Sequence, residues 1–516
     1  MGDLIQNNLQ SLAWFRPELV LAVGSMLLFV LDMVWRGHER RVQRLTTATV
    51  AVLGTAAVLL AMQPTDSVQL FNGMIATDAF ATFFKWIFLA AGILTVLIAA
   101  QGDEIAKARS GEFQAMMLAV VLGMFLMASA TNLLSIYLAI ELVSMVSYVL
   151  AGYRRGDRKA AEGSLKYVIY GGVASGTMLF GMSWLYGLLG TSDVSQFGAK
   201  LSELMVRVTL QGPAAAAATK LALIASLVFV LAGIGYKVAA VPWHMWCPDV
   251  YEGAPTPFTA FLSVGPKAAG FALAVRLFYG TLAGAPSAAG FSEALAGIPW
   301  PAVLGVISAV TMTLGNLTAL PQENLKRLLA YSSIAHAGYT LMGLTAASVI
   351  GTQGVMIYML VYLVMNLGAF LAVIVISQAT GSESIHDARG LARRHPLAAV
   401  AFAIFLFSLT GLPPFAGFTG KWFLFYAVLE RASGPGGVWY VLLALIGGLN
   451  TAVSLYYYAR IVRSMFLDAP RVTTPIEARV GQQVMLAAFS ALVLVFGIWW
   501  NPIVSWSQRS LAMFHL

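Results

Sequence analysis

Long apolar runs recur along the whole chain, separated by short polar segments. Most are about 18 to 27 residues long, enough for an α-helix to cross a hydrocarbon core of about 30 Å. About fourteen runs fit this description, and their approximate bounds are 17–35, 44–62, 78–100, 113–130, 131–153, 164–189, 215–240, 255–283, 298–318, 324–346, 353–378, 397–430 (long and interrupted), 437–466 and 482–503. The pattern predicts an all-α polytopic membrane protein.

The composition agrees with this prediction. Of the 516 residues 59% are hydrophobic and 10% are charged, and the mean hydropathy is +0.78, whereas soluble domains are about 25% charged. The longest connection, about 25 residues around 190–214, is too short for a soluble domain. No cleavable signal is expected, because the first apolar run is long enough to span. We expect a single membrane domain over 1–516.

Basic residues gather in alternate connections. About 19 Lys or Arg fall on one side of the predicted bundle and about 6 on the other. The richer side carries Arg36, Arg40, Arg41, Arg44, Lys107, Arg109, Arg154, Arg155, Arg158, Lys159, Lys326, Arg327, Arg389, Arg393, Arg394, Arg460, Arg463, Arg471 and Arg479. The positive-inside rule places this side in the cytoplasm and both termini in the periplasm. The net charge of +8 follows from this topology. We expect no nucleic-acid partner, because the charges form no single basic face.

The chain has few residues suited to redox or metal chemistry. Its single cysteine, Cys247, excludes an internal disulfide, a CxxC pair and thiolate iron–sulfur ligation within this chain. No nucleotide-binding or HExxH motif is present. We therefore expect no metal and no cofactor in this chain.

Ionisable residues nevertheless lie inside the predicted helices. Glu141, Lys166, Lys237, Lys267 and Lys421 fall within the apolar runs. Such residues cost several kcal/mol at membrane depth, so a series of them indicates a protein that moves charge.

Other polar residues also admit a structural explanation. Lys166 lies close enough to a helix end to snorkel to the interface, and His336 could be a helix-bridging hydrogen bonder. Lys85 and Arg276 are expected to be interfacial anchors. The same role is expected of three residues near the cytoplasmic boundary, namely Trp243, His244 and Trp246. Asp249 and Glu252 are expected either to contact a partner or to lie on a solvated loop.

Two of the predicted helices contain residues that break helices. Gly233, Gly235 and Pro242 surround Lys237, and glycines and prolines between 411 and 420 precede Lys421. Proline removes an amide donor and glycine weakens a helix, so both segments should break at membrane depth. Broken helices at corresponding positions of two halves are typical of inverted-repeat transporters.

The order of the predicted spans indicates how these halves are arranged. Spans four to eight and nine to thirteen would form two five-helix sets, and because five is odd, the second set starts from the opposite side of the membrane. The predicted units are 1–112 (three helices), 113–283 (first repeat), 298–467 (inverted second repeat) and 482–503 (last helix).

Three segments resemble the antiporter-like membrane subunits of respiratory complex I. They read AIELVSMVSYVLAGY (139–153), YKVAAVPWHMWCPDVYEGAPTP (236–257) and GLPPFAGFTGK (411–421). Within that family, the PDVYEGAP stretch (248–255) and a lysine at 421 are similar to the subunit N branch. The similarity runs from about residue 113 to 467, and the flanking helices agree in length.

The resemblance implies a role for individual residues. It places six residues on one proton-translocating axis: Glu141, Lys166, Lys237, Lys267, His336 and Lys421. Glu141 and Lys237 would be the coupled pair, Lys267 the central lysine and Lys421 the terminal proton-carrying residue. The order of transfer is a hypothesis that the resemblance implies.

The resemblance also implies a setting in the respiratory chain. The chain would be a translocase subunit of NADH:quinone oxidoreductase in the bacterial inner membrane, with the lipid bilayer around it. Its neighbours would be another antiporter-like subunit and small membrane subunits. NAD, FMN, iron–sulfur clusters and quinone would bind to partner subunits.

Two other functions remain open from the sequence. A subunit of a multisubunit cation/proton antiporter would share the fold and much of the lysine series. A self-contained solute transporter is the second alternative, although it should show a roomy binding site with its own recognition groups. The PDVYEGAP stretch favours complex I over the antiporter subunit, and the single lysines along successive helices do not fit the binding site of a solute transporter.

Overall fold

The computed structural model describes most of the chain. The described residues are 2–64, 66–105, 109–279, 286–287, 290–291, 300–434, 436–470, 475–476 and 478–511. Lys107 and Arg471, which contribute to the predicted topology, lie outside the described residues, as do the predicted boundaries at 283 and 298.

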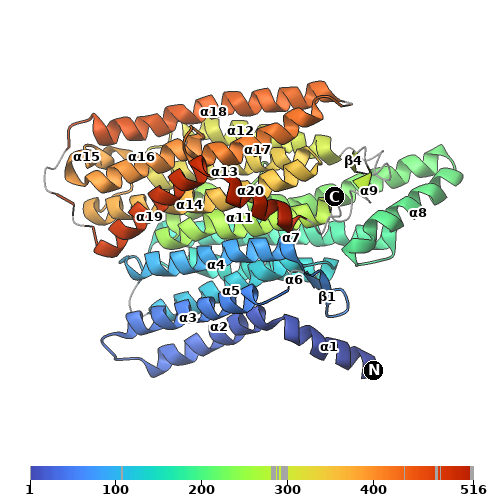
Figure 1. Cartoon of the computed structure of the whole chain (residues 1–516), viewed down its shortest axis with the longest axis horizontal. Helices are drawn as coiled ribbons and strands as arrows, with labels where there is room; N and C mark the ends of the chain where they lie inside the picture. Colours follow the sequence, from blue (N-terminus) through green and yellow to red (C-terminus); the bar gives the residue numbers. More distant parts are fainter. Residues whose placement is uncertain are drawn as a thin grey trace.

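Long, roughly parallel helices make up the molecule, and the N-terminal helices lie along one edge (Figure 1). The first part of the chain forms α1 (Gly2–Trp14), α2 (Arg16–Val34), α3 (Arg41–Ala61) and α4 (Ala79–Ala100). Between α3 and α4, an antiparallel pair of short strands comprises β1 (Val68–Leu70) and β2 (Ile75–Thr77).

The next helices cover the first predicted five-helix set. They are α5 (Ser110–Ser129), α6 (Leu133–Ala151), α7 (Arg158–Leu189), α8 (Phe197–Leu210), α9 (Pro213–Val238), α10 (Cys247–Gly253) and α11 (Thr256–Tyr279), with the 3-10 turn η2 (Val194–Gln196) before α8. A second antiparallel pair, β3 (Pro286–Ser287) and β4 (Gly290–Phe291), follows α11.

The remaining helices cover the second predicted set and the C-terminal part. They are α12 (Trp300–Ala319), α13 (Leu325–Thr345), α14 (Val349–Thr380), α15 (Leu391–Arg394), α16 (Pro396–Thr410), α17 (Ala416–Arg431), α18 (Gly437–Phe466), α19 (Val480–Ile498) and α20 (Asn501–Ser510), with the 3-10 turn η4 (Ile385–Ala388) before α15.

The prediction of a helical polytopic membrane protein is confirmed. Every predicted run coincides with a long helix or, for 397–430, with the pair α16 and α17. Among the described residues, 12 helices are long and apolar enough to cross a membrane; α13 is not among them, and α16 is a shorter apolar helix. The exact number of fourteen crossings therefore stays a prediction.

The long connection around 190–214 contains a helix that the sequence interpretation did not include. In α8, the buried residues recur every three or four positions: Phe197, Leu201, Leu204 and Val208. This spacing gives a helix with one apolar face, which packs on the protein while the other face stays exposed.

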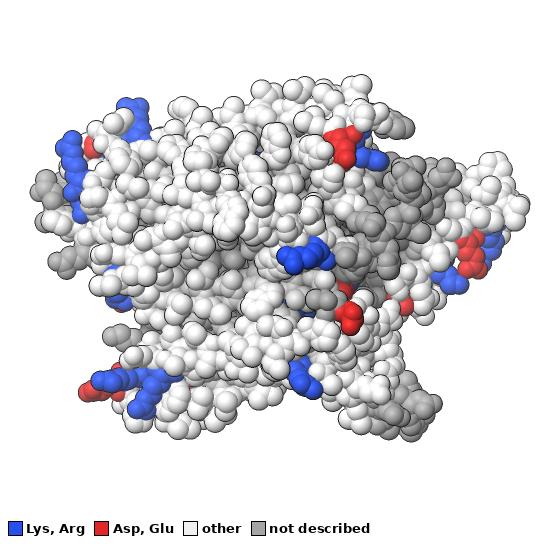
Figure 2. All heavy atoms as spheres, in the orientation of Figure 1, with Lys and Arg blue, Asp and Glu red and all other residues white. Residues whose placement is uncertain are grey.

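Charged residues on the visible face lie mainly at the two ends of the helix bundle (Figure 2). Lys and Arg gather at the end where α2 meets α3 and where α15 lies, and a band without charge covers the helices between the two ends. A charge-free belt is the surface expected of a protein surrounded by lipid.

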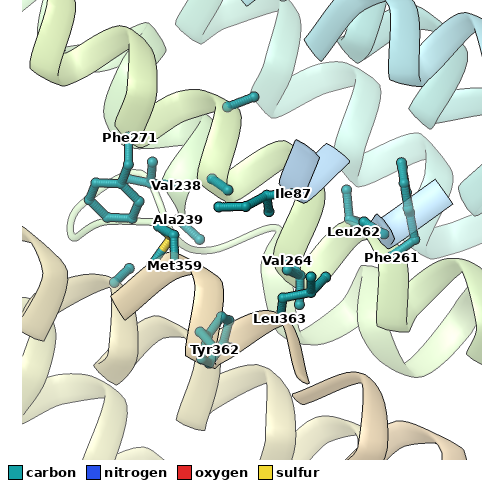
Figure 3. Close-up of a cluster of buried hydrophobic side chains, with 14 of the residues drawn as sticks. Ile87, Val238, Ala239, Phe261, Leu262, Val264, Phe271, Met359, Tyr362 and Leu363 are labelled. Atoms are coloured by element: carbon teal, nitrogen blue, oxygen red, sulfur yellow. The ribbon is translucent and has the colours of Figure 1, made fainter. Parts of the chain in front are cut away.

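The core lies around α11 and α14. All of the most apolar stretch of α11 is buried, as is 94% of that of α14, which is typical of helices that are hydrophobic on every side. Figure 3 shows Val264 and Phe271 of α11 close to Met359 and Leu363 of α14, with Val238 at the end of α9 beside them. Lys237, next to Val238 on α9, and Lys267 on α11 therefore lie on helices that contribute to this core.

Both predicted helix breaks are present. Helix α9 ends at Val238, and Ala239 takes a left-handed conformation with φ of 59° before the chain turns into α10. Helix α16 ends at Thr410, Gly411 has φ of 91°, and α17 begins at Ala416. A left-handed residue is a common way to end a helix.

Candidate functional site

Lys237 lies in the last turn of α9, facing α6. Its side chain is buried, and its Nζ donates a hydrogen bond to Ser144 Oγ at 2.7 Å. Ser144 lies one turn after Glu141 on α6, and the Glu141 carboxylate acts electrostatically on Lys237. Glu141 Oε1 is buried without a hydrogen-bond partner among the described residues. The polar contact between α6 and α9 is therefore made by Ser144, one turn from Glu141.

Lys267 lies in the middle of α11 and faces α13. Its Nζ donates to Ser333 Oγ at 2.6 Å and to the Ser333 carbonyl oxygen at 3.0 Å. The ring of Tyr251 lies on another side, 5.8 Å from Nζ to the centroid. Lys267 is buried at 2% exposure, so these protein groups replace its water shell.

His336 lies one turn after Ser333 on α13. Its Nδ1 shares a hydrogen bond with Tyr358, and its Nε2 lies 3.3 Å from the hydroxyl of Tyr458. Tyr458 also shares a hydrogen bond with Ser332. The imidazole is therefore linked to hydroxyl groups on α14 and α18 as well as on its own helix.

Lys421 lies in the second turn of α17, just beyond the second helix break. Its Nζ donates to the carbonyl oxygen of Thr410 at 2.8 Å and to Thr451 Oγ1 at 3.4 Å, and it lies 4.2 Å from the ring centroid of Tyr339. Tyr339 is on α13, two turns after Ser333. One helix, α13, thus touches both Lys267 and Lys421.

The three lysines share a property that other buried cations lack. Among the residues that the structure describes, no carboxylate forms an ion pair with Lys237, Lys267 or Lys421, whose polar partners are hydroxyls and carbonyl oxygens. Lys326 is equally buried but pairs with Glu383 at 3.1 Å. A buried ammonium without a counterion is costly, so these lysines are unusual on physical grounds.

The prediction that Lys85 and Arg276 are interfacial anchors is wrong. Lys85 is 2% exposed and forms an ion pair with Glu18 of α2 at 2.7 Å. Arg276 is 5% exposed and donates two hydrogen bonds to Asp78, the N-cap of α4. Neither side chain needs to snorkel, because a carboxylate of a neighbouring element meets it inside the protein.

The prediction that Trp243, His244 and Trp246 lie at the membrane interface is also wrong for two of them. Trp246 is 1% and His244 4% exposed. The Trp246 ring stacks on Tyr167 with centroids 4.4 Å apart, and its Nε1 donates to the carbonyl oxygen of Tyr236. Trp246 therefore packs α10 against α7 and α9.

Lys166 has two carboxylate partners. Its Nζ lies 2.7 Å from Glu162 and 2.6 Å from Asp249 of α10. Asp249 and Glu252 both pair with Arg327 of α13, at 2.7 and 2.9 Å. We call the ion pairs of Lys159, Lys166, Asp249, Glu252 and Arg327 the α10 clamp, since they join α10 to α7 and α13.

The clamp also changes the acidity of its carboxylates. Burial would raise the pKa of Asp249, but hydrogen bonds from Lys166 and Arg327 lower it below the ordinary value. The pKa of Glu252 is lowered in the same way. Burial would raise it, but hydrogen bonds from Lys159 and Arg327 lower it. The sequence predicted either a contact with a partner subunit or a solvated loop for these two carboxylates. Both instead have partners within this chain.

The sequence interpretation missed the neutral groups around the lysines. Ser144, Ser333, Thr451 and Tyr339 contact the lysine ammonium groups. Hydroxyl residues are frequent in membrane helices, so nothing in the sequence distinguishes these four. Three of them, Ser144, Ser333 and Tyr339, lie one helical turn from Glu141 or His336, whereas Thr451 lies on α18 without such a neighbour.

No group of three or more His, Cys, Asp or Glu in the described ranges could hold a metal ion.

Comparison with known proteins places this arrangement in a family. A family described as NADH:quinone oxidoreductase/Mrp antiporter, transmembrane, matches residues 130–447. The NADH-quinone oxidoreductase subunit N of Anaeromyxobacter sp. (strain Fw109-5) is 68% identical over 514 residues, covering 99% of this chain and 98% of that protein. Subunit N 2 of Sorangium cellulosum (strain So ce56) is 43% identical, covering 98% of each.

Solved structures of related membrane complexes contain chains with a similar fold. A chain of respiratory complex I from Thermus thermophilus is 30% identical with a TM-score of 0.75, covering 95% of this chain and 98% of that one. A chain of the Mrp complex from Dietzia sp. DQ12-45-1b shares the fold, with a TM-score of 0.77 at 20% identity and 97% coverage of each. The chain belongs to the antiporter-like membrane subunits of NADH:quinone oxidoreductase, in the subunit N branch.

Proposed function

We propose that this chain is the proton-translocating subunit N of a bacterial NADH:quinone oxidoreductase. The observation that carries the proposal is the set of three buried lysines, Lys237, Lys267 and Lys421, which have hydroxyl and carbonyl partners but no ion-paired carboxylate among the described residues. Buried cations that serve structure, such as Lys85 and Arg276, do have one. The contrast supports a role in proton exchange for the three lysines and a structural role for the paired cations.

The chemistry of such a lysine suits proton exchange. Burial disfavours the charged form, and hydroxyl and carbonyl oxygens compensate only in part. The charged and neutral forms are therefore close in free energy, and a nearby charge can decide between them. Glu141, whose carboxylate acts on Lys237, is the group placed to do so at the first lysine.

Proton transfer is proposed to follow the order of the side chains in space. A change at Glu141 would release the proton of Lys237 towards Lys267, and His336 would connect Lys267 with Lys421. The contacts of α13 support this order: Ser333, one turn before His336, accepts a hydrogen bond from Lys267, and the ring of Tyr339, one turn after His336, lies against Lys421. Lys166 is proposed to belong to the same axis at its edge, although its two carboxylate partners give it a structural function as well.

The two five-helix units are proposed to be inverted repeats, 113–283 and 298–467. Backbone hydrogen bonds before α6 and α13 support this proposal. In the first unit, Leu133 N donates to the Ser192 carbonyl oxygen and Val194 N to that of Thr131. In the second unit, Leu325 N donates to the Glu383 carbonyl oxygen and Ile385 N to that of Glu323. In each unit the bonded segment follows a 32-residue helix that ends at a left-handed glycine, Gly190 or Gly381.

The polar positions correspond as well. Asn132 caps α6 and Asn324 caps α13, and Glu141 and Ser333 lie the same number of residues after their caps. Ser144 and His336 also occupy equivalent positions. The second helix of each unit thus offers its polar groups to a lysine, which favours one mechanism used twice. Residues 1–112 and 482–503 would flank these repeats.

The surroundings are proposed from the family. The chain would lie in the bacterial inner membrane with both termini periplasmic, beside another antiporter-like subunit and small membrane subunits. Electron transfer from NADH to quinone, with NAD, FMN and iron–sulfur clusters, would take place in partner subunits and supply the energy.

A cation/proton antiporter subunit is the second candidate. The Mrp chain supports only a shared fold at its level of identity, whereas relatives at 68% and 43% identity over nearly the full length are subunit N proteins. Purification in mild detergent separates the two: copurifying iron–sulfur and flavin subunits are expected, and a partner set without them contradicts the assignment.

Proton pumping by vesicles containing the purified complex tests the function. Lys237→Met keeps the length of the side chain but removes the exchangeable proton, so pumping driven by NADH oxidation should fall at least tenfold. Glu141→Gln should act in the same direction. Lys200→Met, at an exposed pair on α8, is the matched control and should pump normally. Wild-type pumping by both Lys237→Met and Glu141→Gln would show that the assigned path is wrong.

A further inference from the structure

Lys421 occupies a cage without a carboxylate among the described residues. The ring of Tyr339 lies 4.2 Å from Nζ, the carbonyl oxygen of Thr410 accepts a hydrogen bond at 2.8 Å and Thr451 Oγ1 accepts one at 3.4 Å. These groups come from α13, α16 and α18, whereas Lys421 comes from α17. Four elements thus meet at one ammonium group.

Each part of the cage favours a cation. The face of an aromatic ring attracts an ammonium group, most strongly where water is excluded, and Tyr339 and Lys421 are 1% and 5% exposed. The Thr410 carbonyl is at the end of α16, where the last carbonyls lack partners within the helix and carry partial negative charge. Neither the ring nor the carbonyl competes for the proton.

The Tyr339 hydroxyl has two polar neighbours. Asn316 Nδ2 donates to Tyr339 Oη at 3.4 Å, and Thr451 Oγ1 donates to it at 3.3 Å. Asn316 is fully buried and accepts a hydrogen bond from Tyr457 at 2.9 Å. Both donors also have closer acceptors: Asn316 donates to the Met312 carbonyl oxygen at 3.0 Å and to Asn450 Oδ1 at 3.1 Å, and Thr451 donates to the Gly447 carbonyl oxygen at 3.1 Å. The burial of the ring, more than its hydroxyl, therefore keeps its face towards Lys421.

The backbone at the helix break makes room for the lysine. A Cβ atom at Gly411 would lie 2.8 Å from Lys421 Cδ. The glycine therefore serves two needs, a left-handed conformation at the end of α16 and space for the lysine stem. Together these contacts form a built site and not a chance approach of two side chains.

We propose that Tyr339 is a further functional residue of the proton path, whose ring stabilises the protonated form of Lys421. The inference rests on the proposed role of Lys421. The ring makes and breaks no bond, and Lys421 takes up and releases the single proton. A buried cation–π contact favours the charged form by about thirtyfold, a preference that a neighbouring charge can reverse.

Replacement of Tyr339 by phenylalanine and by phenylalanines with one, two and three fluorine atoms tests the inference in the intact complex. Fluorine withdraws electron density from the ring with little change in size. Proton pumping in vesicles should remain within about twofold of wild type in Tyr339→Phe and fall stepwise along the series. NADH–quinone reduction in uncoupled vesicles and subunit content report assembly. Equal pumping across the fluorinated series would overturn the inference.

Aliphatic variants separate the ring from other effects. Tyr339→Leu should reduce pumping about tenfold, whereas Tyr440→Leu, at a buried tyrosine of α18 (9% exposed), should pump near the wild-type rate. Equal losses in Tyr339→Phe and Tyr339→Leu would also overturn the inference, because the hydroxyl alone would then matter. Normal pumping by Lys421→Met would instead contradict the proposed function. If Lys421→Met loses proton pumping while all the fluorinated variants pump equally, the proposed function stands and only the role of the ring is removed.

Discussion

Buried cations in this protein fall into two groups according to their partners. Lys85, Arg276 and Lys326 each meet a carboxylate, while Lys237 and Lys421 meet neutral oxygens. Removing one partner of a buried ion pair leaves a charge that the protein cannot solvate, whereas a lysine among neutral oxygens can lose its proton and become neutral. The side-chain partners therefore divide the buried cations more clearly than their depth in the helices does, and the proposed transport role falls on the group without a carboxylate partner.

The pair of Lys85 and Glu18 provides a test of this distinction. Lys85→Met leaves the Glu18 carboxylate buried without its counterion, which costs about 3 to 5 kcal/mol. We expect a lower thermal unfolding temperature of the purified complex, followed by loss of this subunit. The double variant Glu18→Gln with Lys85→Met removes both charges and should recover most of the lost stability.

An exposed ion pair serves as the control for that experiment. Lys200 pairs with Glu203 on α8, where both side chains are exposed, and such pairs contribute about 0 to 1 kcal/mol. Lys200→Met should therefore leave the unfolding temperature nearly unchanged. A double variant as unstable as Lys85→Met would show that packing, and not the unpaired charge, causes the loss.

At the level of elements, the α10 clamp connects the first helix break to its neighbours. Helix α10 has only seven residues, too few to be stable alone. Trp246 packs it against Tyr167, and Asp249 and Glu252 join it to α7 and α13. The clamp thereby fixes where the chain emerges after Lys237.

The pH dependence of the clamp follows from the lowered pKa of Asp249. A carboxylate with a lowered pKa stabilises the folded protein above its ordinary value near 3.8 and loses this contribution as the pH falls through the lower folded value. Asp249→Asn should lower the unfolding temperature by a constant amount between pH 8 and pH 5. The difference from wild type should shrink only below about pH 4.

Calorimetry of the purified complex checks this prediction, with Asp66→Asn, at an exposed carboxylate near β1, as the control. A difference that shrinks between pH 7 and pH 5 would contradict it, because that behaviour requires a raised pKa. High salt should also reduce the difference, since the pairs are partly exposed and salt screens such charges.

The sequence predicted the long helices and both breaks because their signals are local. Runs of apolar residues mark the spans, and Gly411 and the prolines after it mark the second break. The first break was harder to place: Gly233 and Gly235 remain inside α9, where they let Met178 and Trp243 approach. A close approach between helices leaves the same glycine in the sequence as a break does.

The limits of prediction for the site have a similar cause. Lys237, Lys267 and Lys421 stood out because charge is rare in apolar runs, but Tyr339 and Thr451 did not, since tyrosine and threonine are common there. The error over Lys85 and Arg276 came from their position near helix ends. Their partners, Glu18 and Asp78, are distant in the sequence and could not be paired with them.

Buried charge joins the first three long helices to the rest of the protein. Glu18 of α2 meets Lys85 of α4, and Asp78 at the start of α4 meets Arg276 of α11. An ion pair in a buried interface has one favourable geometry and therefore specifies a docking position. Helices α2 and α4 are thus fixed against α11 at the end of the bundle opposite most of the basic connections.

The proposed orientation in the membrane can be tested because the native thiol is protected. Cys247 is fully buried, and burial raises its pKa to about 11, so a maleimide should not react with it at neutral pH. Glu39→Cys lies in the basic connection between α2 and α3, and Glu203→Cys lies on α8; both positions are exposed.

In spheroplasts, a membrane-impermeant maleimide should label Glu203→Cys from outside and should label Glu39→Cys only after lysis. The expectation follows from the bias of Lys and Arg towards the cytoplasmic side. Unmodified protein is the control and should remain unlabelled in both conditions. The reverse pattern would place both termini in the cytoplasm, and the proposed proton path from Lys237 to Lys421 would then run in the opposite direction across the membrane.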